Sequence, residues 1–213
     1  GSGIELLKNA VQRQHDLSQL SEGLIKEIHD DRSPTARADD NAATTTTPHA
    51  RHIEKITKVM QEAADLVATT LEQGSFPLVL AGDHSTAAST IAGIRRAHPE
   101  QRLGVIWIDA HADIHSPFTT PSGNMHGMPL AIAAQHDNLP EAINDPDATT
   151  RSLWNSLKHL HGSASPAISL RDLIYVGVRD TEAAEDITLA QHEIPVITTA
   201  EAVSYTHLTL PTT

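Results

Sequence analysis

Two aspartates and a histidine, Asp109, His111 and Asp113, follow an apolar run in the middle of the chain at alternate positions. The preceding run, residues 103–108, has the length and the β-branched content of a buried strand. If the backbone stays extended, the three polar side chains project to one side, because strand side chains alternate with period two. The spacing predicts a metal site, and the alternative interpretation is a polar loop that holds these residues by chance.

A second histidine follows another short apolar run. Residues 78–81 predict a strand, and His84 stands at the turn between this strand and a helical pattern over 86–97. Ligands of open α/β sheets bind beyond the carboxyl ends of the strands, so we expect His84 to join the first group. Asp83 is expected to be either a hydrogen-bond acceptor for the His84 imidazole or a turn residue.

Four motifs occur in one order along the chain. They are Ala-Gly-Asp-His-Ser (81–85), Asp-Ala-His-Ala-Asp (109–113), Ser-Gly-Asn-Met-His-Gly-Met-Pro (122–129) and Val-Gly-Val-Arg-Asp-Thr-Glu (176–182). Together they resemble the arginase family of ureohydrolases, enzymes with two manganese ions. The resemblance covers the chain from about residue 74 to residue 202.

The resemblance implies a binuclear Mn²⁺ site. Asp109 would bridge both ions, His84 and Asp113 would complete one, and His111 would bind the other. Such a pair of ions holds a bridging hydroxide, which would attack the guanidinium carbon of L-arginine and release L-ornithine and urea. The family completes the site from a later Ser-x-Asp-x-Asp-x-x-Asp-Pro-like segment, which this sequence does not contain, so two aspartate ligands are missing.

The resemblance also implies a proton shuttle. His126 stands at the position of the family's shuttling histidine, and with Asp113 it makes the expected catalytic pair. An imidazole with an unperturbed pKa near 6.5 suits proton transfer at neutral pH. The alternative is an ordinary loop histidine beside Gly127.

Six further positions correspond to substrate contacts in the family. Three neutral donors, Thr120, Ser122 and Asn124, would hold the α-carboxylate. Glu182 stands where the family has an acidic residue facing the α-amino group, Glu185 matches a nearby acidic position, and His115 completes the six. Glu182 replaces a common aspartate, and its extra methylene leaves its role open. His115 replaces a common asparagine, and it either binds the carboxylate or lines the rim.

Several functions fit these motifs. Arginase is favoured over agmatinase, because the segment 122–124 resembles a carboxylate clamp that agmatine does not need. Formimidoylglutamase is a third alternative. The rival from another class is a non-catalytic fragment or pseudoenzyme that keeps the fold.

Composition narrows the class of protein further. The 213 residues include 27 acidic and 15 basic side chains, for a formal charge of −12, and no cysteine. This balance disfavours binding to nucleic acid or an anionic membrane, and it suits a small cationic substrate such as arginine. The sequence contains neither a membrane-length apolar run nor a signal-peptide pattern, so we expect a cytoplasmic protein.

Alternating strand and helix patterns predict an α/β domain with a mainly parallel sheet between two helical layers, here incomplete. Strands are expected at 78–81, 104–109, 173–178 and 194–198, and helices at 4–30, 50–72, 85–97, 128–135 and 152–160, with a surface loop at 33–49. We expect a partial arginase-like domain over 1–203 and a non-native tail over 204–213, truncated at both ends. The complete protein would form trimers or hexamers.

Overall fold

The computed structural model describes residues 47–204. The helix expected over 4–30, the loop before residue 47 and the tail after residue 204 lie outside the described residues. The structure therefore does not test what the sequence predicts for these three segments.

A three-stranded parallel sheet forms one layer of the fold. Its strands are β1 (Val105–Ile108), β2 (Leu173–Val176) and β3 (Val196–Ile197), in the order β1-β2-β3. Their β-branched and aromatic residues favour the pleated, half-buried backbone. Three of the four expected strands are thus confirmed, and all their pairings are parallel as predicted.

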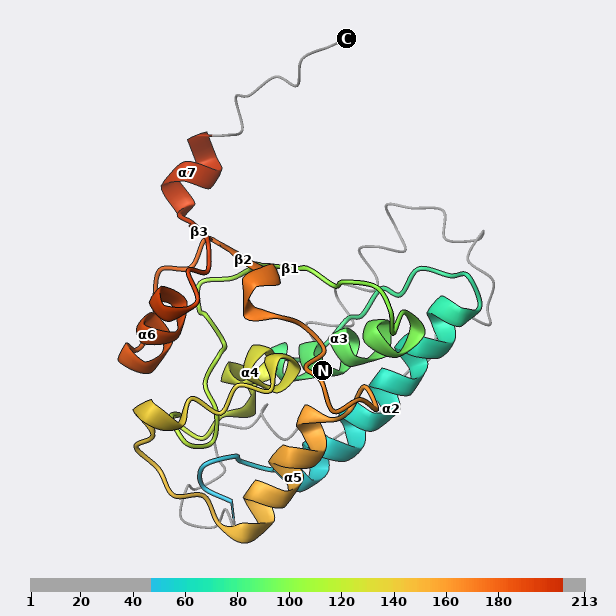
Figure 1. The fold of residues 1–213 in the computed structure, drawn as a ribbon, viewed down its shortest axis with the longest axis horizontal. Coiled ribbons are helices and arrows are strands. Elements are labelled where there is room, and N and C mark those ends of the chain that lie inside the picture. Colours follow the sequence, from blue (N-terminus) through green and yellow to red (C-terminus); the bar gives the residue numbers. More distant parts are fainter. Residues whose placement is uncertain (1–46, 205–213) are drawn as a thin grey trace.

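Helices make the second layer, and Figure 1 shows their arrangement. The α-helices are α2 (Ile53–Glu72), α3 (Ala87–Ala97), α4 (Pro129–Ala134), α5 (Ala148–Lys158), α6 (Ala183–Gln191) and α7 (Thr199–Ser204). Short 3₁₀ turns are η3 (His84–Thr86), η4 (Met125–Gly127), η5 (Leu139–Glu141) and η6 (Leu170–Asp172). Helix α5 begins earlier than expected, because the Asp147 carboxylate accepts a hydrogen bond from the Thr150 amide and caps it.

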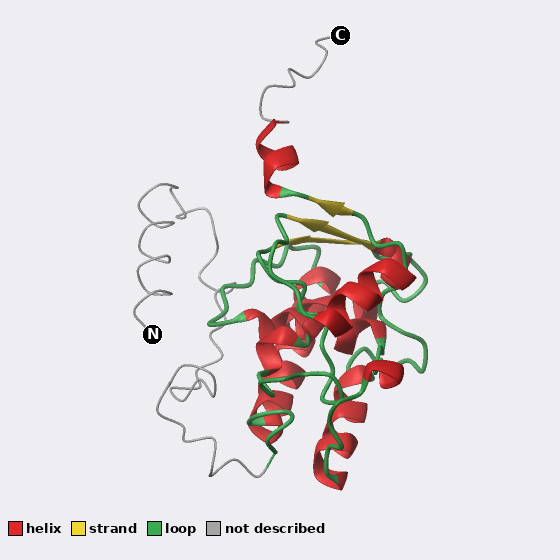
Figure 2. Ribbon diagram, turned by 90° about the vertical axis from the view of Figure 1, so that its left-hand side faces the viewer, coloured by secondary structure: helices red, strands yellow, loops and turns green. Residues whose placement is uncertain are grey.

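The two faces of the sheet differ in burial. Trp107, Leu173 and Tyr175 face the helices and are buried, and Figure 2 shows every helix except α7 on one side of the sheet. Ile106 and Ile108 alternate with them and remain 69% and 77% exposed. The α/β class is confirmed, and residues 47–204 form two of its layers. The full three-layer arrangement needs a further helical layer over Ile106 and Ile108.

The strand expected at 78–81 does not form. Residues 75–81 make no ladder with any other described residue, and Phe76 and Leu78 are 89% and 72% exposed. A strand requires a neighbour for its backbone N–H and C=O groups, and within residues 47–204 this segment has none. The prediction of this strand rested on apolar composition alone and is wrong.

Close packing fixes helix α3 against α2. A Cβ atom added at Gly93 would stand 2.6 Å from the Val67 Cβ and 2.7 Å from the Ala64 carbonyl oxygen. The two helices therefore approach at a distance that only glycine permits at this position. This contact fixes α3 against α2, and the turn η3, which carries His84, directly precedes α3.

Candidate metal centre

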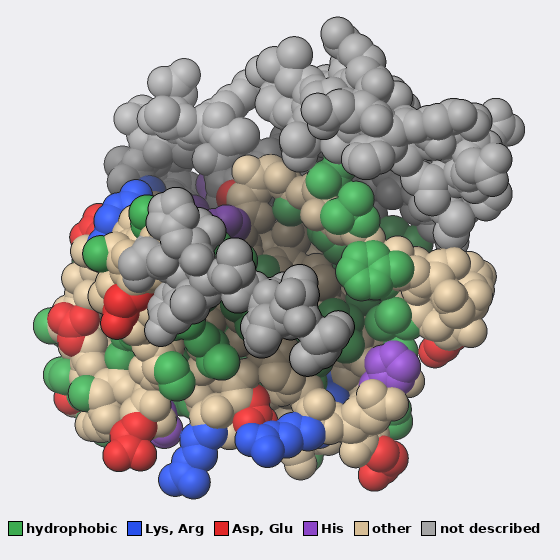
Figure 3. Space-filling view, turned by 90° about the horizontal axis from the view of Figure 1, so that it is seen from above, with side chains coloured by type: hydrophobic (Ala, Val, Ile, Leu, Met, Phe, Trp, Pro, Cys, Tyr) green, Lys and Arg blue, Asp and Glu red, His purple; other side chains and the backbone are tan. Residues whose placement is uncertain are grey.

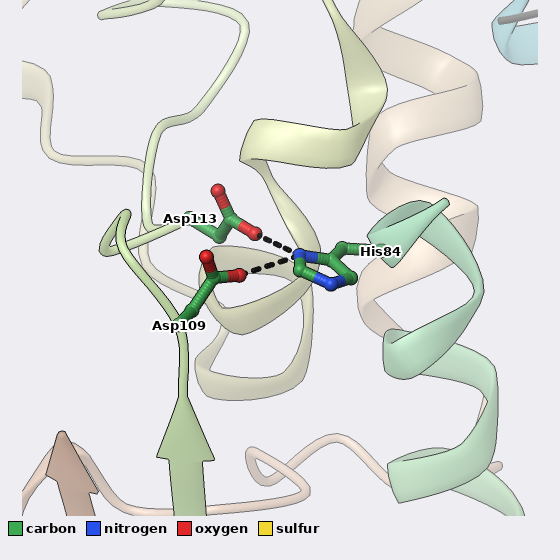
Figure 4. Close-up of side chains that lie close together, drawn as sticks. All are labelled: His84, Asp109 and Asp113. Atoms are coloured by element: carbon green, nitrogen blue, oxygen red, sulfur yellow. Dashed lines mark hydrogen bonds and ion pairs between the residues drawn. The ribbon is translucent and has the colours of Figure 1, made fainter. Parts of the chain in front are cut away.

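Three side chains converge beyond the carboxyl end of β1 (Figure 4). The His84 Nδ1 atom lies 2.6 Å from Asp109 Oδ2 and 2.9 Å from Asp113 Oδ2. One donor atom from each residue lies within 4.8 Å of the others, which is the grouping that a bound cation requires. The structure thus brings together three of the four residues expected to bind metal.

The turn before α3 presents His84. The carboxylate of Asp83 accepts a hydrogen bond of 2.8 Å from the Ser85 amide and caps η3, so Asp83 is the turn residue that one of the two interpretations predicted. The edge of Trp107 contacts the imidazole, with ring centroids 5.4 Å apart and planes at 75°. The cap and the indole together orient His84 towards the carboxylates.

Backbone amides orient Asp109. Its Oδ1 accepts hydrogen bonds from the amides of Ala110 at 2.5 Å and His111 at 3.2 Å. Its Oδ2 is buried and accepts no hydrogen bond, although His84 Nδ1 lies close to it without the alignment of a donor. A buried carboxylate oxygen without a donor is costly unless a cation compensates it, so this oxygen fits a metal ion.

Asp113 reaches the site by a bend in the chain. Its φ of +49° lies in the left-handed region, so the expectation of an extended backbone through residue 113 is wrong. The bend returns its carboxylate to His84 instead of displacing it along the strand direction. Burial raises the pKa of Asp113, and the hydrogen bond with His84 opposes that rise.

His111 lies beside this group rather than within it. Its side chain is 59% exposed, and its Nδ1 stands 3.7 Å from Asp109 Oδ1. The two oxygens of Asp109 therefore face different histidines, Oδ2 towards His84 and Oδ1 towards His111. This is the arrangement that a bridging carboxylate between two ions would have, and His111 remains a predicted ligand of the second ion.

His126 lies on η4, which packs against η3. Its imidazole is exposed, and it is close enough to Asp113 for its charge to lower the pKa of that carboxyl. An exposed imidazole beside the carboxylates is free to exchange protons with a ligand. Its role as a shuttle remains a prediction.

The expected carboxylate donors line a tight turn. The Oγ1 atom of Thr120 is buried and accepts a 3.0 Å hydrogen bond from the Gly123 amide. The Ser122 hydroxyl accepts from the Asn124 amide at 3.2 Å and is exposed. Ser122 and Asn124 therefore reach the surface, whereas Thr120 stabilises the turn from inside.

A segment without any recognisable motif also supports this turn. Gly123 has a φ of +74°, and a Cβ atom there would meet the Pro48 carbonyl oxygen at 1.9 Å. The Arg51 amide donates to the Gly123 carbonyl at 2.8 Å, and its guanidinium reaches Asn124 Oδ1 at 3.5 Å. Residues 48 and 51 carry no pattern, so only the requirement for glycine at 123 could have indicated a close partner.

The last three expected residues form one cluster, in which His115 and Glu185 are buried and Glu182 is exposed. The His115 ring stands 3.0 Å from Thr119 Oγ1 and 2.8 Å from Glu182 Oε2. Glu185 is 5% exposed and accepts hydrogen bonds from the amides of Ile114 and Glu182. Glu182 and Glu185 are the two members of the capping box of α6. Burial raises the pKa of Glu185, and its hydrogen bonds and the neighbouring His115 oppose that rise.

A protein-family model described as the arginase family matches residues 11–208. The chain belongs to the arginase family. Over 200 residues it is 33% identical to the arginase of Emericella nidulans, covering 90% of this chain and 56% of the relative. It is 40% identical over 132 residues to human arginase-1, covering 62% of this chain and 36% of the relative. The chain thus spans about half or less of these curated relatives.

Solved arginases share the fold. The native arginase of Bacillus caldovelox matches with a TM-score of 0.61 at 32% identity, over 74% of this chain and 46% of that one. The Entamoeba histolytica arginase in complex with L-ornithine gives the same TM-score at 29% identity, over 75% of this chain and 49% of that one. Among the described residues of this family member, the helices are too short or too polar to cross a membrane.

Proposed function

We propose that the protein is a manganese-dependent amidinohydrolase that converts L-arginine to L-ornithine and urea. The observation that carries the proposal is the convergence of His84, Asp109 and Asp113 around a buried carboxylate oxygen that lacks a hydrogen-bond donor. Membership of the arginase family supports the reaction, and an L-ornithine complex of one relative supports the product.

The donor set suits manganese. Carboxylate and imidazole ligands fit Mn²⁺, which His84, Asp109 and Asp113 would hold at one position, and His111 with Asp109 at a second. When bound, such ions lower the pKa of water so that it attacks at neutral pH. The carboxylates of the site would also attract the guanidinium group of the substrate.

The chain's own side chains would orient the substrate and move protons. The exposed hydroxyl of Ser122 and the amide of Asn124 would receive the α-carboxylate, and the Glu182 carboxylate would face the α-amino group. An imidazole nitrogen of His126 would carry a proton to the leaving amine. These roles account for the exposure of each group beside the metal centre.

A urea-release assay tests the proposal. The intact protein that carries this sequence is loaded with Mn²⁺ and supplied with L-arginine, agmatine or formimidoylglutamate, with Asp109→Asn as the inactive variant and His98→Asn as the control. We expect urea from L-arginine in the wild type and in the control, and none from Asp109→Asn. Urea mainly from agmatine, formamide from formimidoylglutamate, or no product from any of the three would contradict the proposal.

Family membership also supports proposals about assembly and location. We infer that the complete protein is a homo-oligomer, a trimer or a hexamer. We also infer that it works in the cytoplasm, because a chain without cysteine gains no disulfide from an oxidising compartment. Light scattering of the purified intact protein tests the first statement, and a monomer at micromolar concentration would contradict it. Cell fractionation tests the second.

A further inference from the structure

The imidazole of His115 is closed off from solvent. Its side chain is 9% exposed, and its two nitrogens already have neighbours, Thr119 Oγ1 at 3.0 Å and Glu182 Oε2 at 2.8 Å. The Thr119 hydroxyl oxygen also accepts from the Ser116 amide at 3.0 Å, so the ring is fixed from that side. A substrate would have to displace Glu182 before it could reach His115.

Glu182 has the opposite exposure. Its side chain is 54% exposed, although it stands at the N-cap of α6 and its carboxylate accepts from the amide of Glu185. His115 approaches the same carboxylate from the buried side. The carboxylate is thus held from behind by two neighbours, while part of it faces solvent.

The cluster is tied to the metal centre through the backbone. The Ile114 amide, next to Asp113, donates to Glu185 Oε1 at 3.2 Å. The Tyr175 hydroxyl donates to the Ala112 carbonyl at 2.7 Å from the sheet below. The position of Glu182 is therefore set relative to the same loop that carries Asp109 and Asp113.

We propose that His115 is a positioning residue, which holds the Glu182 carboxylate towards the amino group of the substrate and does not itself contact the substrate. The inference rests on the proposed function and deepens it. Both residues differ from those common in the family, and the geometry explains why they differ together. An aspartate at 182 would withdraw the carboxylate by about 1.5 Å, the length of one C–C bond, and lose the contact with His115.

Two variants of His115 separate its possible roles. In His115→Gln the side-chain amide nitrogen can occupy the place of Nε2, whereas in His115→Asn that place is left empty. We expect His115→Asn to raise the KM for L-arginine about tenfold with kcat within about twofold, because the 2.8 Å approach of Nε2 to the Glu182 carboxylate is lost. We expect His115→Gln to restore the KM to within about threefold. Equal losses in both variants at unchanged melting temperature would overturn the proposal.

Two competitive probes identify which end of the substrate is affected. Agmatine keeps the amine and lacks the carboxylate, and 5-guanidinopentanoate keeps the carboxylate and lacks the amine. If His115 positions Glu182, His115→Asn weakens inhibition by agmatine about tenfold and leaves 5-guanidinopentanoate unchanged. The reverse pattern would show that His115 binds the carboxylate directly and would overturn the proposal.

A measurement without turnover keeps the inference separate from the proposed function. In protein with ¹⁵N-labelled histidine, we expect the Nε2 signal of His115 to shift in Glu182→Gln and to stay unchanged in the control Glu193→Gln. An unchanged signal in Glu182→Gln would overturn the pairing even in an active enzyme. A shifted signal in a protein that releases no urea would leave the pairing intact and refute the proposed arginase activity instead.

Discussion

Two apolar segments lead to the metal centre, and they reach it by different means. The first is β1, which pairs with β2 along its whole length and delivers Asp109 at its carboxyl end. The second is 75–83, which delivers His84 but makes no ladder within residues 47–204. Figure 3 views the molecule from above and shows apolar side chains at its surface. Both segments are rich in apolar residues, yet among residues 47–204 only β1 has a neighbouring strand.

The comparison shows that a metal-ligating side chain can be positioned without a paired strand before it. Asp109 is placed by sheet register and by backbone amides, whereas His84 is placed from its helix. The Asp83 cap, the indole of Trp107 and the close approach of α3 to α2 at Gly93 replace the missing ladder. An apolar run predicts burial only where a partner strand exists, and the run itself does not identify that partner.

The largest expected effect is on metal binding through the paired segment. Asp109→Asn keeps the shape of the side chain but removes its charge, and Asp109 faces both histidines. Loss of a residue that only supports the ligands costs up to about 100-fold in metal affinity. Asp109 is an expected ligand itself, so we expect Mn²⁺ affinity to fall by more than about 100-fold. Titration calorimetry measures it, with Glu62→Gln on the solvent-facing side of α2 as the control. An affinity within tenfold of the wild type would show that Asp109 is not the shared ligand.

The next largest effect contrasts the paired sheet with the segment 75–83 by the same Leu→Ala change at one position in each. Leu173 on β2 is fully buried, so Leu173→Ala should cost about 2–5 kcal/mol of unfolding free energy. Leu78 is 72% exposed, so Leu78→Ala should change it by less than about 0.5 kcal/mol. Urea denaturation of the 213-residue chain measures both. A cost above 2 kcal/mol for Leu78→Ala would show that the segment pairs with residues outside 47–204.

The sequence predicted much of the fold because its strongest patterns are local. Three strands and the helices α2, α3, α4 and α5 follow from hydrophobic periodicity, whereas α6 was not predicted. His84, Asp109 and Asp113 follow from their places after apolar runs. The features that the sequence did not predict depend on residues distant in the chain. The strand at 78–81 required a neighbour, and the positive φ of Asp113 required the fold around it.

The burial of His115 could not be predicted from local sequence patterns for the same reason. Its partner Glu182 lies on another element, 67 positions away in sequence, and only the fold brings the two together. From sequence alone, His115 could be assigned to the carboxylate or to the rim. In the structure it lies beneath Glu182 instead.

A smaller effect tests whether helix packing places His84. In Gly93→Ala the added Cβ would stand 2.6 Å from the Val67 Cβ, and the helices must separate. We expect a loss of about 1–3 kcal/mol of unfolding free energy, with weaker Mn²⁺ binding as η3 shifts. Gly104→Ala is the matched control, because its Cβ would meet only the Asp172 carbonyl at 3.5 Å. Equal melting temperatures for the two variants would refute this packing argument.

The smallest effect lies away from both segments, at the cap of α5. Asp147→Ala removes the hydrogen bond to the Thr150 amide and should cost about 1 kcal/mol, whereas Asp147→Asn keeps an acceptor and should cost less. That hydrogen bond holds the pKa of Asp147 below its ordinary value, so the charged form contributes stability above pH ~3.9 and loses it as pH falls through the lower folded value. The stability gap between wild type and Asp147→Asn should therefore narrow below about pH 4. Mn²⁺ affinity at neutral pH should not change, because Asp147 contacts neither of the two segments that position the metal ligands. A stability gap that widens in acid, or a loss of Mn²⁺ affinity, would contradict this account.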